Sequence, residues 1–455
     1  MQYKKRKETI ERMQTEQKSL IQLFIPICLE TLCYMLAGAV DTLMLSSVGD
    51  QAVGAVGTSN TYIGMFIIMF SIISSGMIAV MTQYIGAGQP GIAYQARQLG
   101  LLFNVIVGIV MSLVLSICSG TILQAVGIAD SLAEYATTYL RIIGAGFLLN
   151  ATIPIFSSYL RAFGHTKQPL IASLCGNGIN LVLNAVFLFV FHYGVAGVAI
   201  ATVISRLFNL IVVIVAAQRK IDAHKSPERL PNKVVMGQII QVGLPSALES
   251  GLYNVAMTLV IRFLNQMDAE GLNVTARSYV SQITNFSYSV GAALAQANAI
   301  MTGWRIGARK FEECDKATKK AALIGIGIAA VIGAVIAFSS RWFMGFFTGD
   351  PRMIQLVGTL MIVDIVLEMG RVGNLVFGNA LKTSGDALFT TMIGLVFMYL
   401  CAVGGTWLFG LHMGLLAVGA YIAMASDECI RAICMFLRWN SGKWREKGFL
   451  HQTEQ

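Results

Sequence analysis

Charged residues are scarce in this chain of 455 residues, where they make up only 13% of the sequence. An ordinary soluble domain carries about 25%. Hydrophobic residues make up 55%, and the mean hydropathy is +0.66. This composition excludes a soluble globular domain, intrinsic disorder, a coiled coil and collagen. We therefore expect a protein that is embedded in a membrane.

Motifs of soluble enzymes are also missing. The eight cysteines form no CxxC pair and no metal-ligand spacing, which excludes a zinc site and a secreted disulfide scaffold. No GxxxxGK[ST] motif is present to hold ATP phosphates, and no HExxH motif is present to hold a catalytic metal. The chain is predicted to be no enzyme and to use no cofactor.

Apolar runs of about 20 residues recur along the whole chain, and each is long enough to cross a hydrocarbon core about 30 Å thick. Backbone polar groups inside a bilayer must be paired within the segment, so each run is predicted to be a helix. The predicted fold class is an all-α polytopic membrane protein with twelve transmembrane helices in two pseudo-symmetric six-helix lobes. The predicted spans are residues 20–45, 61–85, 98–117, 136–160, 169–190, 195–217, 236–262, 277–302, 320–340, 353–381, 387–409 and 414–437.

The positive charge of the chain indicates its orientation. A basic run at residues 4–7 directly precedes the first span, as a cytoplasmic flank does, so we expect no nucleic-acid partner. With the N-terminus inside, about 25 of the 33 Lys and Arg fall in cytoplasmic segments. Both termini are therefore predicted to be cytoplasmic, in a multi-pass protein of the plasma membrane, which is the inner membrane of a bacterium.

The two halves of the chain are related in sequence at an offset of about 220 residues. Residues 26–30 (PICLE) correspond to 245–249 (PSALE), and residues 160–164 (LRAFG) to 381–385 (LKTSG). Each half holds six spans, so the repeat is parallel, and such transporters bind substrate between their lobes. The predicted parts are a cytoplasmic segment (1–19), an N-lobe (20–217), a cytoplasmic linker (218–235), a C-lobe (236–437) and a cytoplasmic tail (438–455).

Seven carboxylates fall inside predicted spans, where an ionisable group requires a partner, a cavity or a role. They are Glu30, Asp41, Glu249, Asp364, Glu368, Asp427 and Glu428. Counting along each helix at 1.5 Å per residue places Asp41, Asn180, Asn184 and Thr202 at similar depth in the outer half of the membrane. Such oxygen ligands suit a cation or a proton. The alternative is a polar cluster that only holds the N-lobe helices together.

The C-lobe offers a second candidate site for coupling or substrate, formed by Glu249, Asp364, Glu368 and Arg371 near the membrane midplane. Glu368 and Arg371 are three residues apart, so a plain ion pair within one helix is the alternative for them. The same argument pairs Asp427 and Glu428 with Arg431. Glu30 is predicted to be structural or cavity-lining.

Prolines occupy corresponding positions in the first span of each half. Pro26 and Pro245 each lie four residues before a carboxylate, and a proline inside a helix weakens or kinks it. We consider both as candidate gating kinks. Proline is also simply more frequent in membrane helices than in soluble ones.

Taken in order, these features resemble the multidrug and toxic compound extrusion (MATE) family of the MOP flippase superfamily, over essentially the whole chain. The resemblance rests on Pro26 and on residues 40–42 (VDT), 83–88 (QYIGAG), 161–164 (RAFG), 180–184 (NLVLN), 194–197 (GVAG), 243–245 (GLP) and 381–386 (LKTSGD). It implies export of organic cations in exchange for H+ or Na+. It also implies that Asp41 is a coupling residue with Asn180 and Thr202 as its partners.

The resemblance leaves the coupling ion and the coupling lobe open. Asn184 stands where some members of the family have a second carboxylate, which argues against a strong Na+ site. Other branches place coupling in the C-lobe, where Glu249 and Asp364 are the nearest matches. No metal is expected other than Na+ at the N-lobe cluster.

The predicted function is therefore a secondary active antiporter for multidrug efflux. Its expected partners are small organic cations and membrane lipids, and it is expected to be a monomer. The alternative is a lipid-linked oligosaccharide flippase of the same superfamily. The span interiors hold seven carboxylates against four arginines, Arg141, Arg206, Arg371 and Arg431, which favours cationic cargo over that alternative.

Overall fold

The computed structural model describes residues 18–125, 128–221 and 227–450. The basic run at residues 4–7, Lys225 of the predicted linker and residues 451–455 of the predicted tail lie outside these ranges. Every regular element in the described part of the chain is a helix, which confirms the predicted all-α class.

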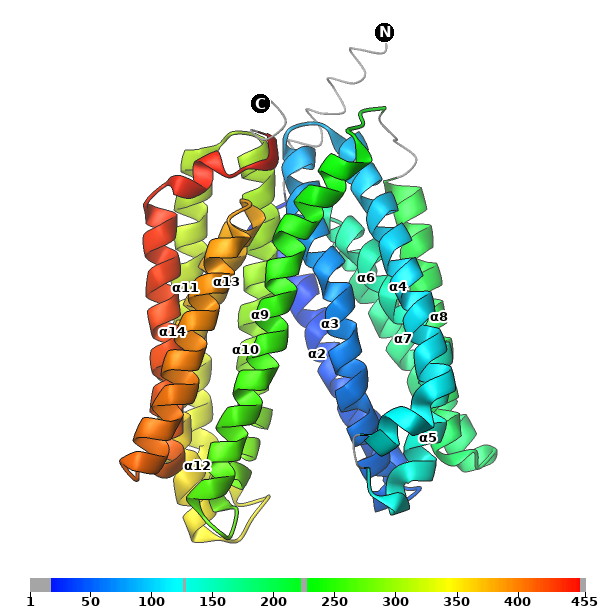
Figure 1. Ribbon diagram of the computed structural model, residues 1–455, viewed down its shortest axis with the longest axis vertical. Coiled ribbons are helices and arrows are strands. Elements are labelled where there is room, and N and C mark those ends of the chain that lie inside the picture. The colour runs from blue at the N-terminus through cyan, green and yellow to red at the C-terminus, as the bar shows by residue number, and fades with distance from the viewer. Residues whose placement is uncertain (1–17, 126–127, 222–226, 451–455) are drawn as a thin grey trace. The chain divides into compact units, whose positions relative to one another are not determined.

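The chain divides into two compact units, Met1–Gly243 and Leu244–Gln455, which we call unit 1 and unit 2. Within each unit the helices run side by side (Figure 1). Unit 1 contains α2 (Leu20–Leu45), α3 (Asp50–Gly86), α4 (Pro90–Ala125), α5 (Asp130–Ala145), α6 (Phe147–Ala162), α7 (Lys167–Ala185), the π-helix η1 (Val186–Val190) and α8 (Gly194–Lys220).

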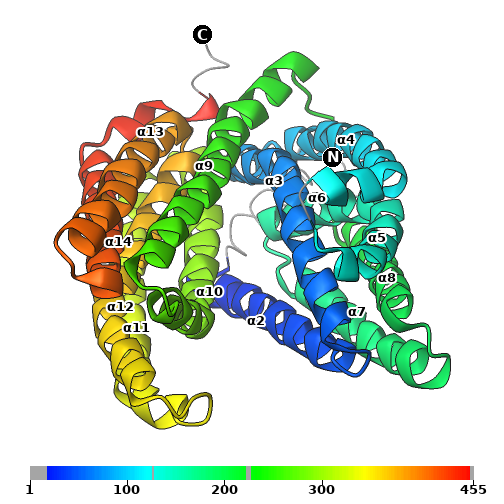
Figure 2. The same cartoon turned by 60° about the horizontal axis from the view of Figure 1, so that its bottom comes forward.

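Helix α9 (Asn232–Met267) runs from unit 1 into unit 2. In unit 2, α12 packs against α10, α11 and α14 and lies among them (Figure 2). The other elements of unit 2 are α10 (Leu272–Gly307), α11 (Phe311–Met344), α12 (Pro351–Thr383), α13 (Ala387–Phe397), the π-helices η3 (Met398–Gly404) and η4 (Thr406–His412), α14 (Leu416–Asn440) and the short 3-10 helix η5 (Lys443–Glu446).

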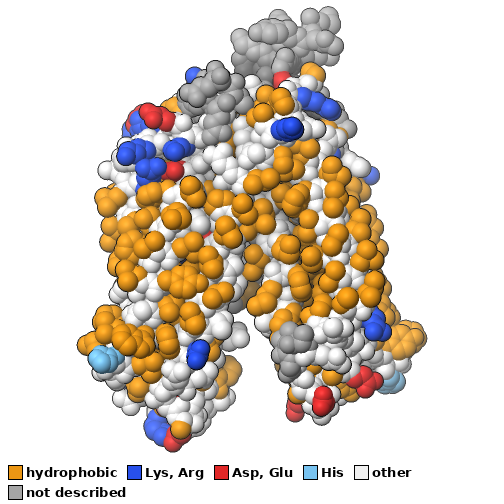
Figure 3. Space-filling view, viewed as in Figure 1, with side chains coloured by type: hydrophobic (Ala, Val, Ile, Leu, Met, Phe, Trp, Pro, Cys, Tyr) orange, Lys and Arg blue, Asp and Glu red, His pale blue; other side chains and the backbone are white. Residues whose placement is uncertain are grey.

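Among the described residues, nine helices are long and apolar enough to cross a membrane, and the bent pair α5 and α6 makes a tenth. Helices α10 and α14 complete the twelve predicted spans. Helix α14 is more polar because Asp427, Glu428 and Arg431 lie in its middle. On the face shown in Figure 3, hydrophobic side chains cover the middle of the helices and charged side chains gather toward their ends. This distribution suits a bilayer.

The fourth predicted span, residues 136–160, is not one straight helix. It is formed by α5 and α6, which meet at Gly146 with a bend of 48°. At this bend Ser112 of α4 donates a hydrogen bond to Gly144 O at 2.6 Å, with Ala145 O at 3.1 Å. A hydroxyl group from a neighbouring helix thus satisfies carbonyl groups at the break. The continuous apolar run gave no indication of it.

The internal repeat is visible in the backbone of the two units. In unit 1 the π-helix η1 is followed by His192 and Gly194, both left-handed, with φ of 55° and 56°. In unit 2 the π-helix η4 is followed by Gly414 and Leu416, also left-handed, with φ of 72° and 53°. The two units therefore share the same local turn, although the glycine occupies a different position in each.

The beginning of α9 belongs to unit 1. A Cβ atom added at Gly76 of α3 would collide with the carbonyl oxygen of Ile239, and one added at Gly243 would collide with that of Ile72. Glycine is thus required where the backbones of α3 and α9 approach each other. Tyr84 of α3 also donates a hydrogen bond to Gln238 Oε1 at 3.1 Å. The unit boundary consequently lies inside α9, beyond the predicted linker.

Candidate ion-coupling sites

The four polar residues predicted for the N-lobe lie together in unit 1. Asn184 Nδ2 donates hydrogen bonds to Asp41 Oδ1 at 2.7 Å and to Asn180 Oδ1 at 3.2 Å. Asn180 Nδ2 lies 3.5 Å from Thr202 Oγ1. One carboxylate from α2, two amides from α7 and a hydroxyl from α8 thus form one cluster. Asn180 and Asn184 meet because they lie one helical turn apart.

The chemistry of this cluster fits a cation or a proton. Asn184 is fully buried, and its Oδ1 has no hydrogen-bond partner among the described residues. Asp41 is partly buried and accepts a hydrogen bond, but it has no ion pair within the described part of the chain. An unpaired carboxylate beside a free amide oxygen offers hard oxygen ligands and one negative charge. These are the groups that an alkali cation or a proton would need.

The predicted C-lobe residues take part in a larger network between α12 and α14. Glu368 pairs with Arg371, as the spacing within the helix suggested. Arg371 also reaches across to Glu428 at 3.3 Å, and Asn374 donates to the same carboxylate at 3.0 Å. Arg431 contacts Glu428 at 3.0 Å and Asp427 at 2.8 Å. Three carboxylates are therefore held by two arginines.

Asp364 stands apart from this network. It is 4% exposed, and its carboxylate has no hydrogen bond or ion pair among the residues that the structure describes. It lies one turn from Glu368 on α12. An unpaired buried carboxylate is costly in a membrane, and it is therefore a candidate for a functional group. Each unit thus has one carboxylate inside a span without an ion pair among the described residues, although Asp364 lies on the fourth span of unit 2 and Asp41 on the first span of unit 1.

Glu30 and Glu249 each have a basic partner on another helix. Glu30 of α2 pairs with Arg161 at 2.7 Å, and Glu249 of α9 pairs with Lys382 at 2.8 Å. Thr391 of α13 also donates to Glu249, at 3.3 Å. The sequence interpretation missed both basic partners, because it placed Arg161 and Lys382 in cytoplasmic connections just beyond the apolar runs. The signal that could have found them is their correspondence in the repeat.

Pro26 and Pro245 lie inside α2 and α9, and neither proline ends its helix. A proline cannot donate to the carbonyl group four residues earlier, which in α2 is that of Gln22. The hydroxyl group of Thr166 donates to Gln22 O instead, at 3.5 Å. The freed carbonyl in unit 1 is thereby satisfied by the residue that precedes α7.

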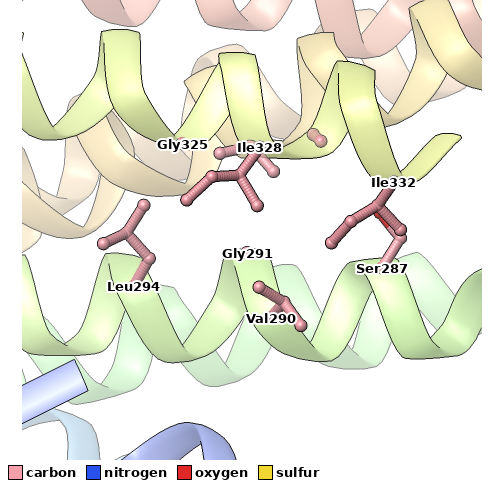
Figure 4. A pocket seen from close by; sticks show the side chains of 9 residues that line it. Ser287, Val290, Gly291, Leu294, Gly325, Ile328 and Ile332 are labelled. Carbon is pink, nitrogen blue, oxygen red and sulfur yellow. The ribbon is translucent and has the colours of Figure 1, made fainter. Parts of the chain in front are cut away.

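A small crevice lies between α10 and α11 in unit 2, with Val372 of α12 also lining it (Figure 4). Its volume is about 10 Å³, which is room for about one water molecule. Ser287, Gly291 and Leu294 face Gly325 and Ile328 across it. The crevice is too small for an organic substrate.

Long apolar helices in two related units, each with one carboxylate inside a span that has no ion pair among the described residues, are typical of a polytopic membrane transporter. The family model described as MatE matches residues 26–186 and 245–408. The chain therefore belongs to the MATE family, whose members are transporters and not enzymes.

Two relatives extend this finding. The chain is 32% identical over 436 residues to the uncharacterized transporter YisQ of Bacillus subtilis (strain 168), covering 94% of this chain and 95% of that protein. It is 22% identical over 440 residues to the probable multidrug resistance protein NorM of Thermotoga maritima, covering 95% and 94% of the two chains.

Solved structures agree on the fold. One is an outward-facing multidrug resistance MATE family transporter of the MOP superfamily, with a TM-score of 0.84 and 20% identity over 93% of this chain and 95% of that one. Another is a MATE protein in the straight conformation, with a TM-score of 0.83, 21% identity and the same coverage.

Proposed function

We propose that this transporter is a secondary active antiporter that exports small organic cations in exchange for H+ or Na+. The observation that carries the proposal is the pairing of the seven carboxylates inside its spans. Five of them have a basic partner, and Asp41 and Asp364 have none among the described residues. Each unit thus contains one carboxylate that an ion could neutralise. Relatives named as probable multidrug resistance proteins support the export of drugs.

Coupling follows from differential binding. An ion taken up at Asp41 stabilises one arrangement of the transporter, and the substrate stabilises the other. The same carboxylate can then bind an ion from one side of the membrane and release it on the other. Asp364 is the second candidate carrier. Asn184 donates a hydrogen bond to Asp41 Oδ1, and the free Oδ1 of the same amide would be a second ligand for a bound cation.

Cationic cargo agrees with the charge of the groups inside the spans. Two unpaired carboxylates attract organic cations, and the 22 methionines provide adaptable apolar surface for ligands of varied shape. The protein is proposed to act as a monomer in the inner membrane with both termini in the cytoplasm, since most Lys and Arg fall in the segments between spans on that side.

The test is uptake of a fluorescent organic cation into proteoliposomes under an imposed pH gradient and, separately, under a Na+ gradient. Uptake that is driven by either gradient supports the proposal and identifies the coupling ion. Asp41→Asn should abolish drive by that ion if unit 1 carries it, and Asp364→Asn should do so if unit 2 carries it. Asp50→Asn, which removes an exposed carboxylate at the start of α3, is the matched control.

Two outcomes would overturn the proposal. One is uptake under neither gradient by correctly folded protein, which would favour a lipid-linked oligosaccharide flippase. The other is wild-type uptake by the double variant Asp41→Asn and Asp364→Asn, because no unpaired carboxylate would then remain inside the described spans to carry the ion.

A further inference from the structure

The two ion pairs Glu30–Arg161 and Glu249–Lys382 occupy the same place in the two units. In each unit the glutamate lies on the first helix, four residues after a proline. The basic residue lies at the end of the fourth span of its own unit. Arg161 is in the last turn of α6 in unit 1, and Lys382 is in the last turn of α12 in unit 2. The N···O distances are 2.7 Å and 2.8 Å. One ion pair has thus been retained in both copies of the repeat.

The helix ends that carry the basic residues are also alike. Gly164 is left-handed with φ of 77°, and its N–H donates to Arg161 O at 2.8 Å. Gly385 is left-handed with φ of 98°, and its N–H donates to Lys382 O at 3.1 Å. Such a turn fixes the end of a helix, where a positive charge is favoured by the helix dipole. Both basic groups are therefore held at a defined position.

A second contact is duplicated beside each pair. In unit 1, Asn177 of α7 donates to Cys33 O of α2 at 3.4 Å. In unit 2, Tyr399 of η3 donates to Leu252 O of α9 at 3.1 Å. These donors and acceptors also correspond in the repeat, although the donor side chain has changed from an amide to a phenol. The first helix of each unit is therefore held by a polar contact on the next turn as well.

The ion cluster of unit 1 has no such copy. Residues of unit 2 at the positions that correspond to Asp41, Asn180 and Asn184 are Val260, Ala402 and Thr406. Both units thus share the ion pair, whereas only one contains this cluster. The ion pair is present in both units, so we expect it to serve a structural role that both units share. The Asp41 cluster is present in unit 1 alone, so ion binding at that cluster would be specific to unit 1.

We infer that Arg161 and Lys382 are positioning residues that form two copies of one ionic latch, each holding the proline-containing part of the first helix against the fourth span. The glutamate side chain is 8% exposed in unit 1 and 22% exposed in unit 2. Removing one partner would leave the other charge largely buried and unpaired, which is strongly unfavourable. Glu249 is then a latch residue and not an ion carrier. This inference rests on the proposed function only for its transport readout.

The test combines transport with amide hydrogen exchange of the full-length protein. Lys382→Gln and Arg161→Gln should each lower the initial rate of organic-cation uptake by about tenfold. They should also raise exchange about tenfold in the proline-containing part of α9 or α2 alone. Uptake and protection from exchange should both be restored when the two charges of a pair are exchanged. The double variants are Glu249→Lys with Lys382→Glu, and Glu30→Arg with Arg161→Glu. Lys382→Arg and Arg161→Lys should retain both, even where a single loss of charge prevents folding.

Glu313→Gln, which breaks the exposed pair with Lys310 on α11, is the control and should change neither readout. Unchanged exchange in Lys382→Gln and Arg161→Gln would overturn the inference. So would a charge-exchange variant at Glu249 that recovers protection but not uptake, because Glu249 would then itself carry the ion. The wild-type protein could also fail to transport under any gradient while the variants change amide hydrogen exchange as expected. This result would reject the proposed function but not the ionic latch.

Discussion

Asn184 Nδ2 lies 2.7 Å from Asp41 Oδ1 and 3.2 Å from Asn180 Oδ1, so one amide nitrogen serves two acceptors. The oxygen of the same amide has no partner among the described residues. The cluster therefore has one carboxylate and one free neutral oxygen. The single negative charge of the cluster limits how strongly the cluster can bind a metal cation such as Na+.

Asn184→Asp would place a second carboxylate in this cluster. A second charged oxygen ligand strengthens the binding of a hard cation, so we expect the uptake rate under a Na+ gradient to rise by about tenfold. The measurement is initial uptake at several Na+ concentrations. An unchanged Na+ dependence in a folded variant would mean that this cluster does not bind Na+.

Arg431→Gln should destabilise unit 2 severely, because Arg431 contacts both Asp427 and Glu428 in the buried part of α14. Leaving a buried charge without its partner costs about 3–5 kcal/mol. The measurement is thermal unfolding in detergent. Lys319→Gln, which removes a partly exposed pair with Asp315, is the control and should cost less than about 1 kcal/mol. Equal effects of the two substitutions would contradict this expectation.

Leu416→Gly should be more stable than Leu416→Ala. Leu416 has φ of 53°, and a left-handed backbone costs an L-residue roughly 1–2 kcal/mol, which glycine avoids. Both substitutions remove the leucine side chain, so their difference isolates the backbone strain. Thermal unfolding of the two variants measures it. Alanine at least as stable as glycine would contradict the strain.

Gly243→Ala should destabilise the protein by about 1–3 kcal/mol, because the added methyl group meets Ile72 O where α9 crosses α3. Gly237 provides a control on the same helix, since a Cβ there meets nothing within 4 Å. Gly237→Ala should be neutral or stabilising by up to about 1 kcal/mol. Thermal unfolding distinguishes the two, and a tolerated Gly243→Ala would show that the two backbones can separate.

Asp268→Asn should reduce stability in a pH-dependent way. Burial acts to raise the pKa of Asp268, but hydrogen bonds from Asn273, Leu272 and Gly271 outweigh it and hold the pKa below its usual value. A carboxyl group with a lowered folded-state pKa stabilises the protein at pH above about 4 and loses this effect as the pH falls through the folded-state pKa. The variant should therefore unfold at a lower temperature than wild type at pH 7, and the gap should close toward pH 3. A gap that does not depend on pH would exclude the charge as its cause.

The sequence predicted the relationships that the geometry of a single helix determines. Depth along each span placed Asp41, Asn180, Asn184 and Thr202 at one level, since the rise per residue is fixed. The same regularity predicted the contacts of Arg431 and the pair of Glu368 with Arg371.

Contacts between helices could not be predicted in this way. The reach of Arg371 to Glu428 depends on how α12 and α14 are rotated against each other, which periodicity along one helix does not specify. Arg161 and Lys382 were assigned to the aqueous side because hydropathy falls at the helix ends. Their long side chains extend back to buried carboxylates, and a hydropathy profile does not record the direction of a side chain.

The unbroken course of α9 through Gly243 decides where this gene could be divided into two separately expressed fragments. A cut between α8 and α9 would leave residues 232–243 on the C-terminal fragment, although they pack on α3 of the N-terminal one. Residues 232–243 of the C-terminal fragment could then bind α3 of the N-terminal fragment. Reassembly would depend on the close contacts at Gly76 and Gly243. A cut after Gly243 would keep residues 232–243 with α3 but would break α9. The two fragments should therefore complement each other more efficiently when the cut lies between α8 and α9.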